Sequence, residues 1–71
     1  MRLIINGHER EIDRAAQHLQ EVVVQCLGLL PDRVAVELNR QIVPRGKWSE
    51  TQVKDGDRLE IVHFVGGGLA H

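Results

Sequence analysis

The segment 58–68, RLEIVHFVGGG, contains the longest strand-like run in this chain of 71 residues and continues directly into three glycines. Apolar Leu59 and Ile61 alternate with charged residues, as in a strand that buries one face. Glycine loses more conformational freedom on ordering than any other residue, so three in a row are a poor end for a folded element. We therefore expect a folded domain over residues 1–65 and a flexible, glycine-rich tail over 66–71.

Strand patterns also precede this segment. The run RLIIN (2–6) ends in an Asn-Gly pair, which accepts the positive φ angles of a type I′ turn. This predicts a β-hairpin whose half-exposed return strand is HEREI (8–12). RVAVEL (33–38) is rich in β-branched residues and alternates, so it predicts a further strand. A brief strand, QIV (41–43), should follow it.

Between the expected strands 8–12 and 33–38, the spacing of the apolar residues changes from that of a strand to that of a helix. Five apolar residues fall at i, i+3, i+4, i+7 and i+8, which is one face of a helix: Leu19, Val22, Val23, Cys26 and Leu27. Asp13 could cap an early turn, or His18 could stand at the cap of the helix. Gly28 follows where the left-handed residue after a helix is expected. The irregular stretch 45–53 suggests a short helical turn at Trp48, which we expect to pack over the edge of the core.

The order of these elements predicts an α+β fold. One amphipathic helix can cover one face of one sheet, so we expect a mixed β-sheet of four to five strands packed on a single α-helix. A chain of this size buries only about 60% of its unfolded surface and has room for one modest core.

Composition narrows the classes of function. The formal net charge is −1, with no basic excess, and only two side chains are aromatic, so nucleic-acid binding is disfavoured. No apolar run approaches the length needed to cross a bilayer, which predicts no membrane partner. A single cysteine allows no internal disulfide, in keeping with a cytoplasmic protein.

Three stretches carry a resemblance to a known family: VAVELNRQIVPRGKW (34–48), KDGD (54–57) and LEIVHFVGGG (59–68). With the order of strands and helix, they resemble the sulfur-carrier proteins of thiamine biosynthesis, the ThiS type. The resemblance extends through Gly68. It implies the ubiquitin-like β-grasp fold.

The resemblance also implies a role. The carboxylate at the end of the tail would be adenylated by a ubiquitin-activating-type adenylyltransferase that uses ATP and magnesium. A persulfide sulfur donor would then displace AMP and leave a thiocarboxylate, whose sulfur passes to the thiazole synthase. The carrier itself would be no enzyme and would bind no cofactor.

The chain departs from the family pattern after the glycines. Leu69-Ala70-His71 holds the Gly68 carbonyl in a peptide bond. Some β-grasp carriers resemble this chain in having extra residues that a protease removes. We expect cleavage after Gly68 to expose the acceptor, with Gly67 as the second choice. A cloning remnant is the alternative explanation of the three residues.

A partner-binding surface is expected where the last strand ends. If Leu59 and Ile61 face the helix, Val62 and Phe64 point away from it and form a docking surface together with Val65, Gly66 and Gly67. The alternative is that Phe64 curls into the core.

The remaining chemistry-bearing residues indicate no site. Cys26 lies on the apolar helix face and is expected to be an inert core residue. The four histidines show no ligand spacing, so no metal site is predicted: His8, His18, His63 and His71. No nucleophile and base are paired, and Ser49 has no neighbouring His or Asp motif.

Two further functions stay open on the sequence. The chain could carry sulfur for molybdopterin, a tRNA thionucleoside or a sulfur amino acid. Alternatively, it could be a ubiquitin-like interaction module that is never thiolated.

Overall fold

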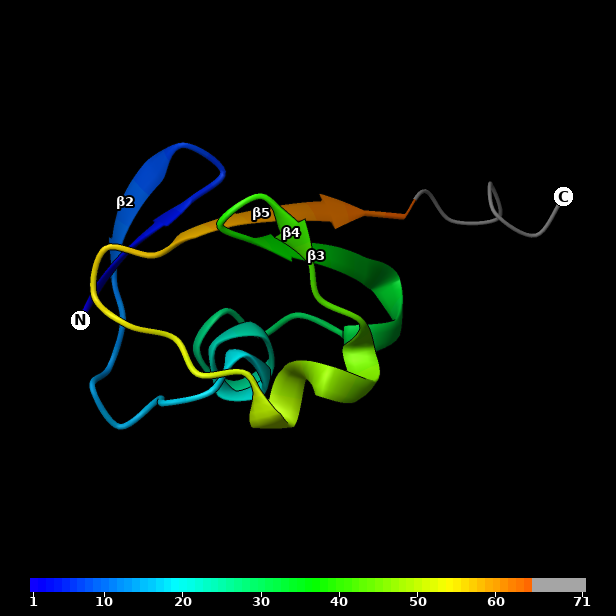
Figure 1. Cartoon of the computed structure of the whole chain (residues 1–71), viewed down its shortest axis with the longest axis horizontal. Helices are drawn as coiled ribbons and strands as arrows, with labels where there is room; N and C mark the ends of the chain where they lie inside the picture. The colour runs from blue at the N-terminus through cyan, green and yellow to red at the C-terminus, as the bar shows by residue number, and fades with distance from the viewer. Residues whose placement is uncertain (65–71) are drawn as a thin grey trace, which may run out of the picture.

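The computed structural model describes residues 1–64, in which a sheet lies over a layer of short helical segments (Figure 1). The strands are β1 (Arg2–Ile5), β2 (His8–Glu11), β3 (Val34–Leu38), β4 (Gln41–Ile42) and β5 (Arg58–His63). The helical segments are η1 (Glu21–Cys26), η2 (Pro31–Arg33) and η3 (Arg45–Glu50). The predicted tail, 66–71, and the domain boundary at residue 65 lie outside the described residues.

The five strands are ordered β2-β1-β5-β3-β4, so the last strand of the chain is the central one. β1 and β5 run parallel, whereas β5 pairs with β3, β3 with β4 and β1 with β2 in antiparallel fashion. The parallel pair requires a long crossover, and the helical layer supplies it. The predicted mixed sheet is therefore confirmed.

The β1–β2 hairpin turns where the Asn-Gly pair predicts. Asn6 has a φ of 51° and Gly7 a φ of 82°, as a type I′ turn requires. The return strand is wholly exposed, not half-exposed as expected, because β2 ends at Glu11, before the buried Ile12. β2 is an edge strand, and its charged side chains oppose pairing with another sheet.

The helix lies where its apolar period predicts, but it is not a regular α-helix. Leu19 and Gln20 are α-helical, and η1 continues with π-helical spacing, in which Leu27 N–H donates to Val22 O at 2.9 Å. Consecutive valines crowd the preceding turn of an α-helix, and a wider helix relieves that crowding. Gly28 has a φ of 67°, which confirms the predicted left-handed end.

Glu21 closes the start of this helix, and His18 directly precedes its first α-helical residue, Leu19. The Oε1 of Glu21 accepts hydrogen bonds from the backbone N–H groups of Gln17 and His18, both at 3.1 Å, and lies 3.2 Å from His18 Nδ1. Asp13 caps an early turn, as one of the two alternatives predicted, accepting from Ala15 N–H at 2.9 Å. Together, the Gln17 N–H and the His18 ring lower the pKa of the Glu21 carboxyl below its ordinary value of 4.5.

Glu21→Gln is expected to reduce the free energy of unfolding at neutral pH, because glutamine accepts these hydrogen bonds less strongly than a carboxylate does. A lowered pKa means that the contribution of Glu21 is complete above pH 4.5 and is lost as the pH falls through the folded-state pKa. Urea unfolding of both proteins across this range should therefore give a stability difference that closes on acidification. A difference that persisted at the acidic end would contradict this account.

The core lies between the sheet and the helical layer. Its fully buried side chains come from β1, the helix, β3, η3 and β5: Leu3, Leu19, Val22, Val23, Val36, Trp48 and Leu59. Trp48 belongs to the core with an exposed fraction of 1% and also lines a surface groove, which agrees with its predicted packing over the edge of the core. Its indole Nε1 donates to Val43 O at 2.8 Å, and this bond allows the polar end of the ring to be buried.

Candidate functional site

The end of β5 is held from both sides. Toward β3, Phe64 N–H donates to Arg33 O at 2.8 Å. Toward β1, the side chain of Asn6 accepts from Ile61 N–H at 2.7 Å and donates to Ile61 O at 3.1 Å. β5 therefore ends at one end of the sheet with hydrogen bonds to neighbouring elements on both sides (Figure 1).

Sequence reasoning assigned Asn6 to a turn and missed this second role. Its amide takes the place of a backbone unit and extends the parallel β1–β5 ladder beyond Leu59, whose C=O accepts from Asn6 N–H at 2.9 Å. No local pattern signals a bond between residues so far apart in the chain. Only the positive φ of an Asn-Gly turn could be recognised in advance.

The start of β5 is fixed by a buried carboxylate. Asp57 has an exposed fraction of 6%, and its two oxygens accept from Asn39 Nδ2 at 3.1 Å and from Lys54 N–H at 2.9 Å. These bonds join the turn before β5 to the β3–β4 turn. Both ends of the strand that leads to the tail are thus tied to neighbouring elements.

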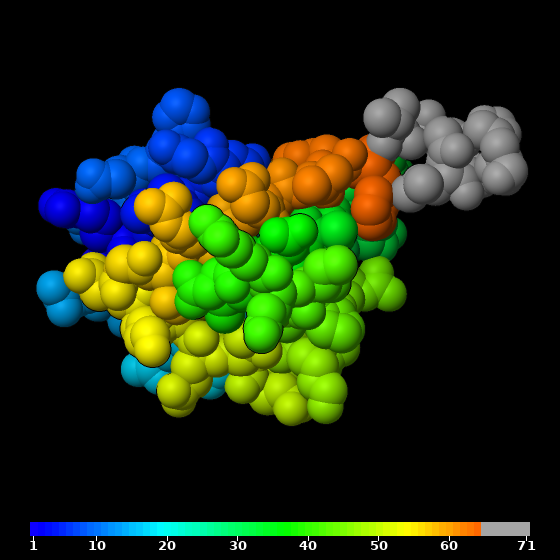
Figure 2. Space-filling model, turned by 45° about the horizontal axis from the view of Figure 1, so that its top comes forward, coloured from blue at the N-terminus to red at the C-terminus, as the bar shows by residue number. Residues whose placement is uncertain are grey.

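The outer face of the sheet exposes apolar side chains beside the end of β5. Leu59 and Ile61 face the core, with 1% and 7% exposed, whereas Val62 is 61% exposed. Ile42 on β4 is 73% exposed. Figure 2 shows β1 and β2 in blue, β5 in orange and β3 and β4 in green side by side on the surface.

Phe64 lies between the two expected positions. Its exposed fraction is 40%, so it is neither in the core nor fully on the outer face. It lines a shallow, mainly apolar groove with Val34, Pro44 and Trp48. Val62 and Phe64 are therefore accessible, and their partner-binding role stays a prediction. Val65, Gly66, Gly67 and Gly68 lie outside the described residues.

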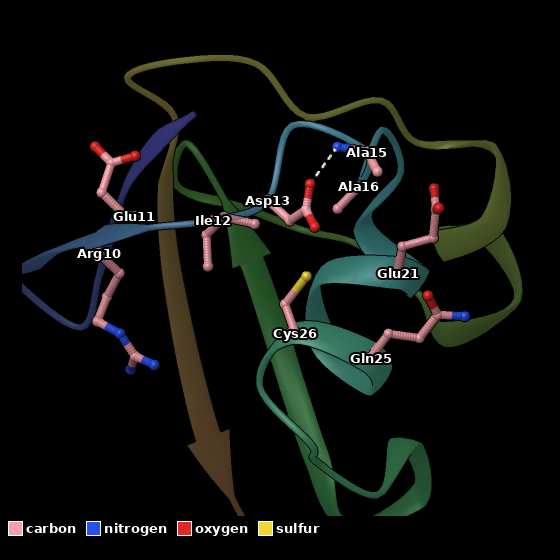
Figure 3. A pocket seen from close by; sticks show the side chains of 9 residues that line it. All are labelled: Arg10, Glu11, Ile12, Asp13, Ala15, Ala16, Glu21, Gln25 and Cys26. Carbon is pink, nitrogen blue, oxygen red and sulfur yellow. Dashed lines mark hydrogen bonds between the residues drawn. The ribbon is translucent and has the colours of Figure 1, made fainter.

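A separate hollow of about 400 Å³ lies between the end of β2 and η1. Figure 3 shows the Cys26 side chain pointing into it, opposite Ile12 and Asp13. Cys26 is half-buried and packs against the core cluster, so its prediction as a core residue is correct only in part. Cys26 lies in the last turn of η1, beside the hollow, so its side chain is only partly covered by the rest of the core.

The hollow lacks the groups that catalysis would need. Arg10, Glu11 and Gln25 line it with polar side chains, and no histidine is among its lining residues. Within residues 1–64, no three His, Cys, Asp or Glu side chains are close enough to hold a metal ion. In the same range, no helix is long and apolar enough to cross a membrane.

Comparison with known proteins identifies the family. The model of the ThiS family matches residues 3–68, from the first strand to the third glycine. The chain belongs to the ThiS family. The sulfur carrier protein ThiS of Escherichia coli is 31% identical over 68 residues, which are 96% of this chain and all of that protein.

The crystal structure of the thiamine biosynthesis protein ThiS from Geobacter metallireducens is similar to this chain with a TM-score of 0.79 and 35% identity. The likeness covers 96% of this chain and all of that one. The five-stranded mixed sheet with its helical layer is thus the predicted β-grasp fold. Two of the relatives, from Bacillus subtilis and Escherichia coli, are sulfur carrier proteins by name.

A longer relative contains a ThiS-like segment. A thiazole synthase from Paramagnetospirillum magneticum is 46% identical over 68 residues, which are 96% of this chain but 20% of that protein. The thiazole synthase from Magnetococcus marinus matches in the same way at 35% identity. The chain therefore spans about a fifth of the length of these two relatives.

Proposed function

We propose that this chain carries sulfur to thiazole formation as a thiocarboxylate on Gly68. The family match through Gly68 is the observation that carries the proposal. The fixed exit of β5 supports it, because a group carrier must direct its reactive end into the sites of other proteins. Glycine has no side chain and suits a narrow channel and close approach to another backbone.

The proposed chemistry begins with activation by a ubiquitin-activating-type adenylyltransferase. The Gly68 carboxylate attacks the α-phosphorus of ATP, and magnesium pyrophosphate leaves. A persulfide sulfur then attacks the acyl carbon and expels AMP, forming an acyl disulfide. A thiol of the sulfur-donor system cleaves that disulfide and releases the thiocarboxylate. ATP and magnesium belong to the activating enzyme, and all these steps are assigned to the cytoplasm.

Activation requires a free carboxylate at the end of the tail. In the given chain, the Gly68 carbonyl is bonded to Leu69 and cannot act as a carboxylate. We assign the removal of Leu69-Ala70-His71 to a protease that cleaves after Gly68. Cleavage after Gly67 is the second choice, and it would leave a Gly-Gly end.

The thiazole synthase is the proposed final partner. Two relatives that carry a ThiS-like segment are thiazole synthases, which supports this choice over a molybdopterin or tRNA pathway. The exposed Val62 and Phe64 beside the tail are proposed to contact the partner proteins while the glycines enter their sites.

Deletion of the gene tests the pathway. The deletion strain is expected to stop growing without thiamine and to recover when the thiazole precursor is supplied, since only that half of thiamine needs the carrier's sulfur. A plasmid copy should restore growth, and a copy truncated before Gly66 should not. Unaffected growth without thiamine would refute the proposed pathway and favour another sulfur acceptor or a non-thiolated interaction module.

A further inference from the structure

Two glutamates face each other on the outer face of the sheet. Glu37 of β3 and Glu60 of β5 are directly opposite in the antiparallel register. The Cβ atoms of such a pair are about 4.5–5.5 Å apart, and like charges there destabilise the sheet. This pairing is expected to lower the stability of the fold, and a neutral residue at either of the two positions would remove the repulsion.

No cationic nitrogen of the described residues lies within 4.0 Å of either carboxylate, and the nearest cation along β5 on this face is Arg58, two residues before Glu60. The chain has six glutamates. Four of them have a basic nitrogen within 4.0 Å: Glu9, Glu11 and Glu50 lie beside an amino or guanidinium group, and Glu21 lies beside the His18 ring. Among residues 1–64, Glu37 and Glu60 are the two glutamates without such a partner. The carboxylates that oppose each other are thus also the ones that the fold leaves unpaired.

Exposed apolar side chains flank the pair. Ile42 on β4 lies opposite Glu37, and Val62 follows two residues after Glu60 on the same face of β5. They are 73% and 61% exposed. An acidic pair between apolar side chains complements a protein surface on which a basic side chain stands among apolar ones. The lower dielectric at such a contact would strengthen the attraction.

We propose that Glu37 and Glu60 together receive an arginine or lysine side chain of the thiazole synthase. This inference rests on the proposed function and names the docking surface for one of its partners. A guanidinium can bond both carboxylates at once, so docking would replace a repulsion by two charge-assisted bonds. The thiazole synthase is the chosen occupant because two relatives carry the ThiS-like segment within a thiazole synthase chain.

The proposal predicts opposite effects on the stability of the carrier and on its affinity for the partner, which a purely structural role of the two glutamates would not give. Neutralising the pair should stabilise the carrier alone while weakening its complex. Removal of one like-charge pair is expected to raise Tm by roughly 1–4 °C in a domain of this size. Loss of a close interfacial charge contact is expected to raise Kd by about tenfold.

The test compares the full chain with Glu37→Gln, Glu60→Gln and the double variant. Binding to the purified thiazole synthase of the same organism is measured by calorimetry at low and high salt, and Tm is measured for each carrier alone. Glu50→Gln is the matched control, since Glu50 lies on η3 and pairs with Lys47 at 3.6 Å. We expect the double variant to have a higher Tm, a higher Kd and a weaker salt dependence, and the control to bind as the parent does.

Equal Kd values for parent and double variant would overturn this inference and leave the proposed function intact. A lower Tm of the double variant would also overturn it, because the pair would then stabilise the fold. If the double variant bound the thiazole synthase as the parent does but bound the adenylyltransferase more weakly, the thiazole synthase would be the wrong partner for this surface. No binding of the parent to the thiazole synthase would overturn both the inference and the proposed partner.

Discussion

Gly68→Leu should abolish thiocarboxylate formation, with a loss of at least about 100-fold, because small displacements of a reacting group in an active site can cost that much. A branched side chain at the acceptor should hold the carboxylate away from ATP in a channel that fits glycine. The variant is assayed as a chain ending at residue 68, so that trimming is not required. Adenylyltransferase, ATP, magnesium and the sulfur donor are supplied, and the product is measured by intact mass.

Two matched chains complete this experiment. Gly68→Ala adds one methyl group at the same position and is expected to retain partial loading. A chain ending at Gly67 tests the second-choice acceptor directly and is expected to load poorly. Efficient loading of the leucine variant would refute the assignment of Gly68, and efficient loading of the shorter chain would transfer it to Gly67.

Trp48→Ala is expected to remove a large part of the free energy of unfolding of the domain. Trp48 is 1% exposed, and removal of a buried tryptophan costs about 3–5 kcal/mol. The change also deprives Val43 O of its indole donor. A domain of this size has a free energy of unfolding of roughly 4–11 kcal/mol, so the loss is a large part of the total.

Urea unfolding followed by circular dichroism measures this effect. Trp48→Phe is the matched control: it keeps most of the apolar volume and loses only the hydrogen bond, so its loss of stability should be much smaller. If Trp48→Ala unfolded at the same urea concentration as the parent, Trp48 would not be the centre of the core.

The features that the sequence predicts well are local. The Asn-Gly turn, the alternation of β5 and the left-handed Gly28 each depend on neighbouring residues alone, and the structure has all three. The π-helical spacing of η1 was not predicted, because the apolar residues at i, i+3, i+4, i+7 and i+8 fit the period of an α-helix. It becomes visible only when the valines are packed against the sheet.

The contacts that fix the tail-bearing strand depend on the tertiary structure. Asn6 bonds to Ile61, and Asp57 to Asn39, across long intervals of sequence. The opposition of Glu37 and Glu60 likewise follows from the register of β3 with β5, which no single segment encodes. Alternation predicted that Val62 and Phe64 would be exposed, and both are, although Phe64, beyond the end of the strand, is only 40% exposed.

The intact mass of the untagged protein from its own cells tests the central claim most directly. We expect a species that ends at Gly68 and lacks Leu69-Ala70-His71, together with one heavier by a single oxygen-to-sulfur exchange. The heavier species should accumulate when the thiazole synthase gene is deleted. A mass equal to the full chain alone, even during thiamine starvation, would mean that the tail is never freed and would contradict the assignment as a sulfur carrier.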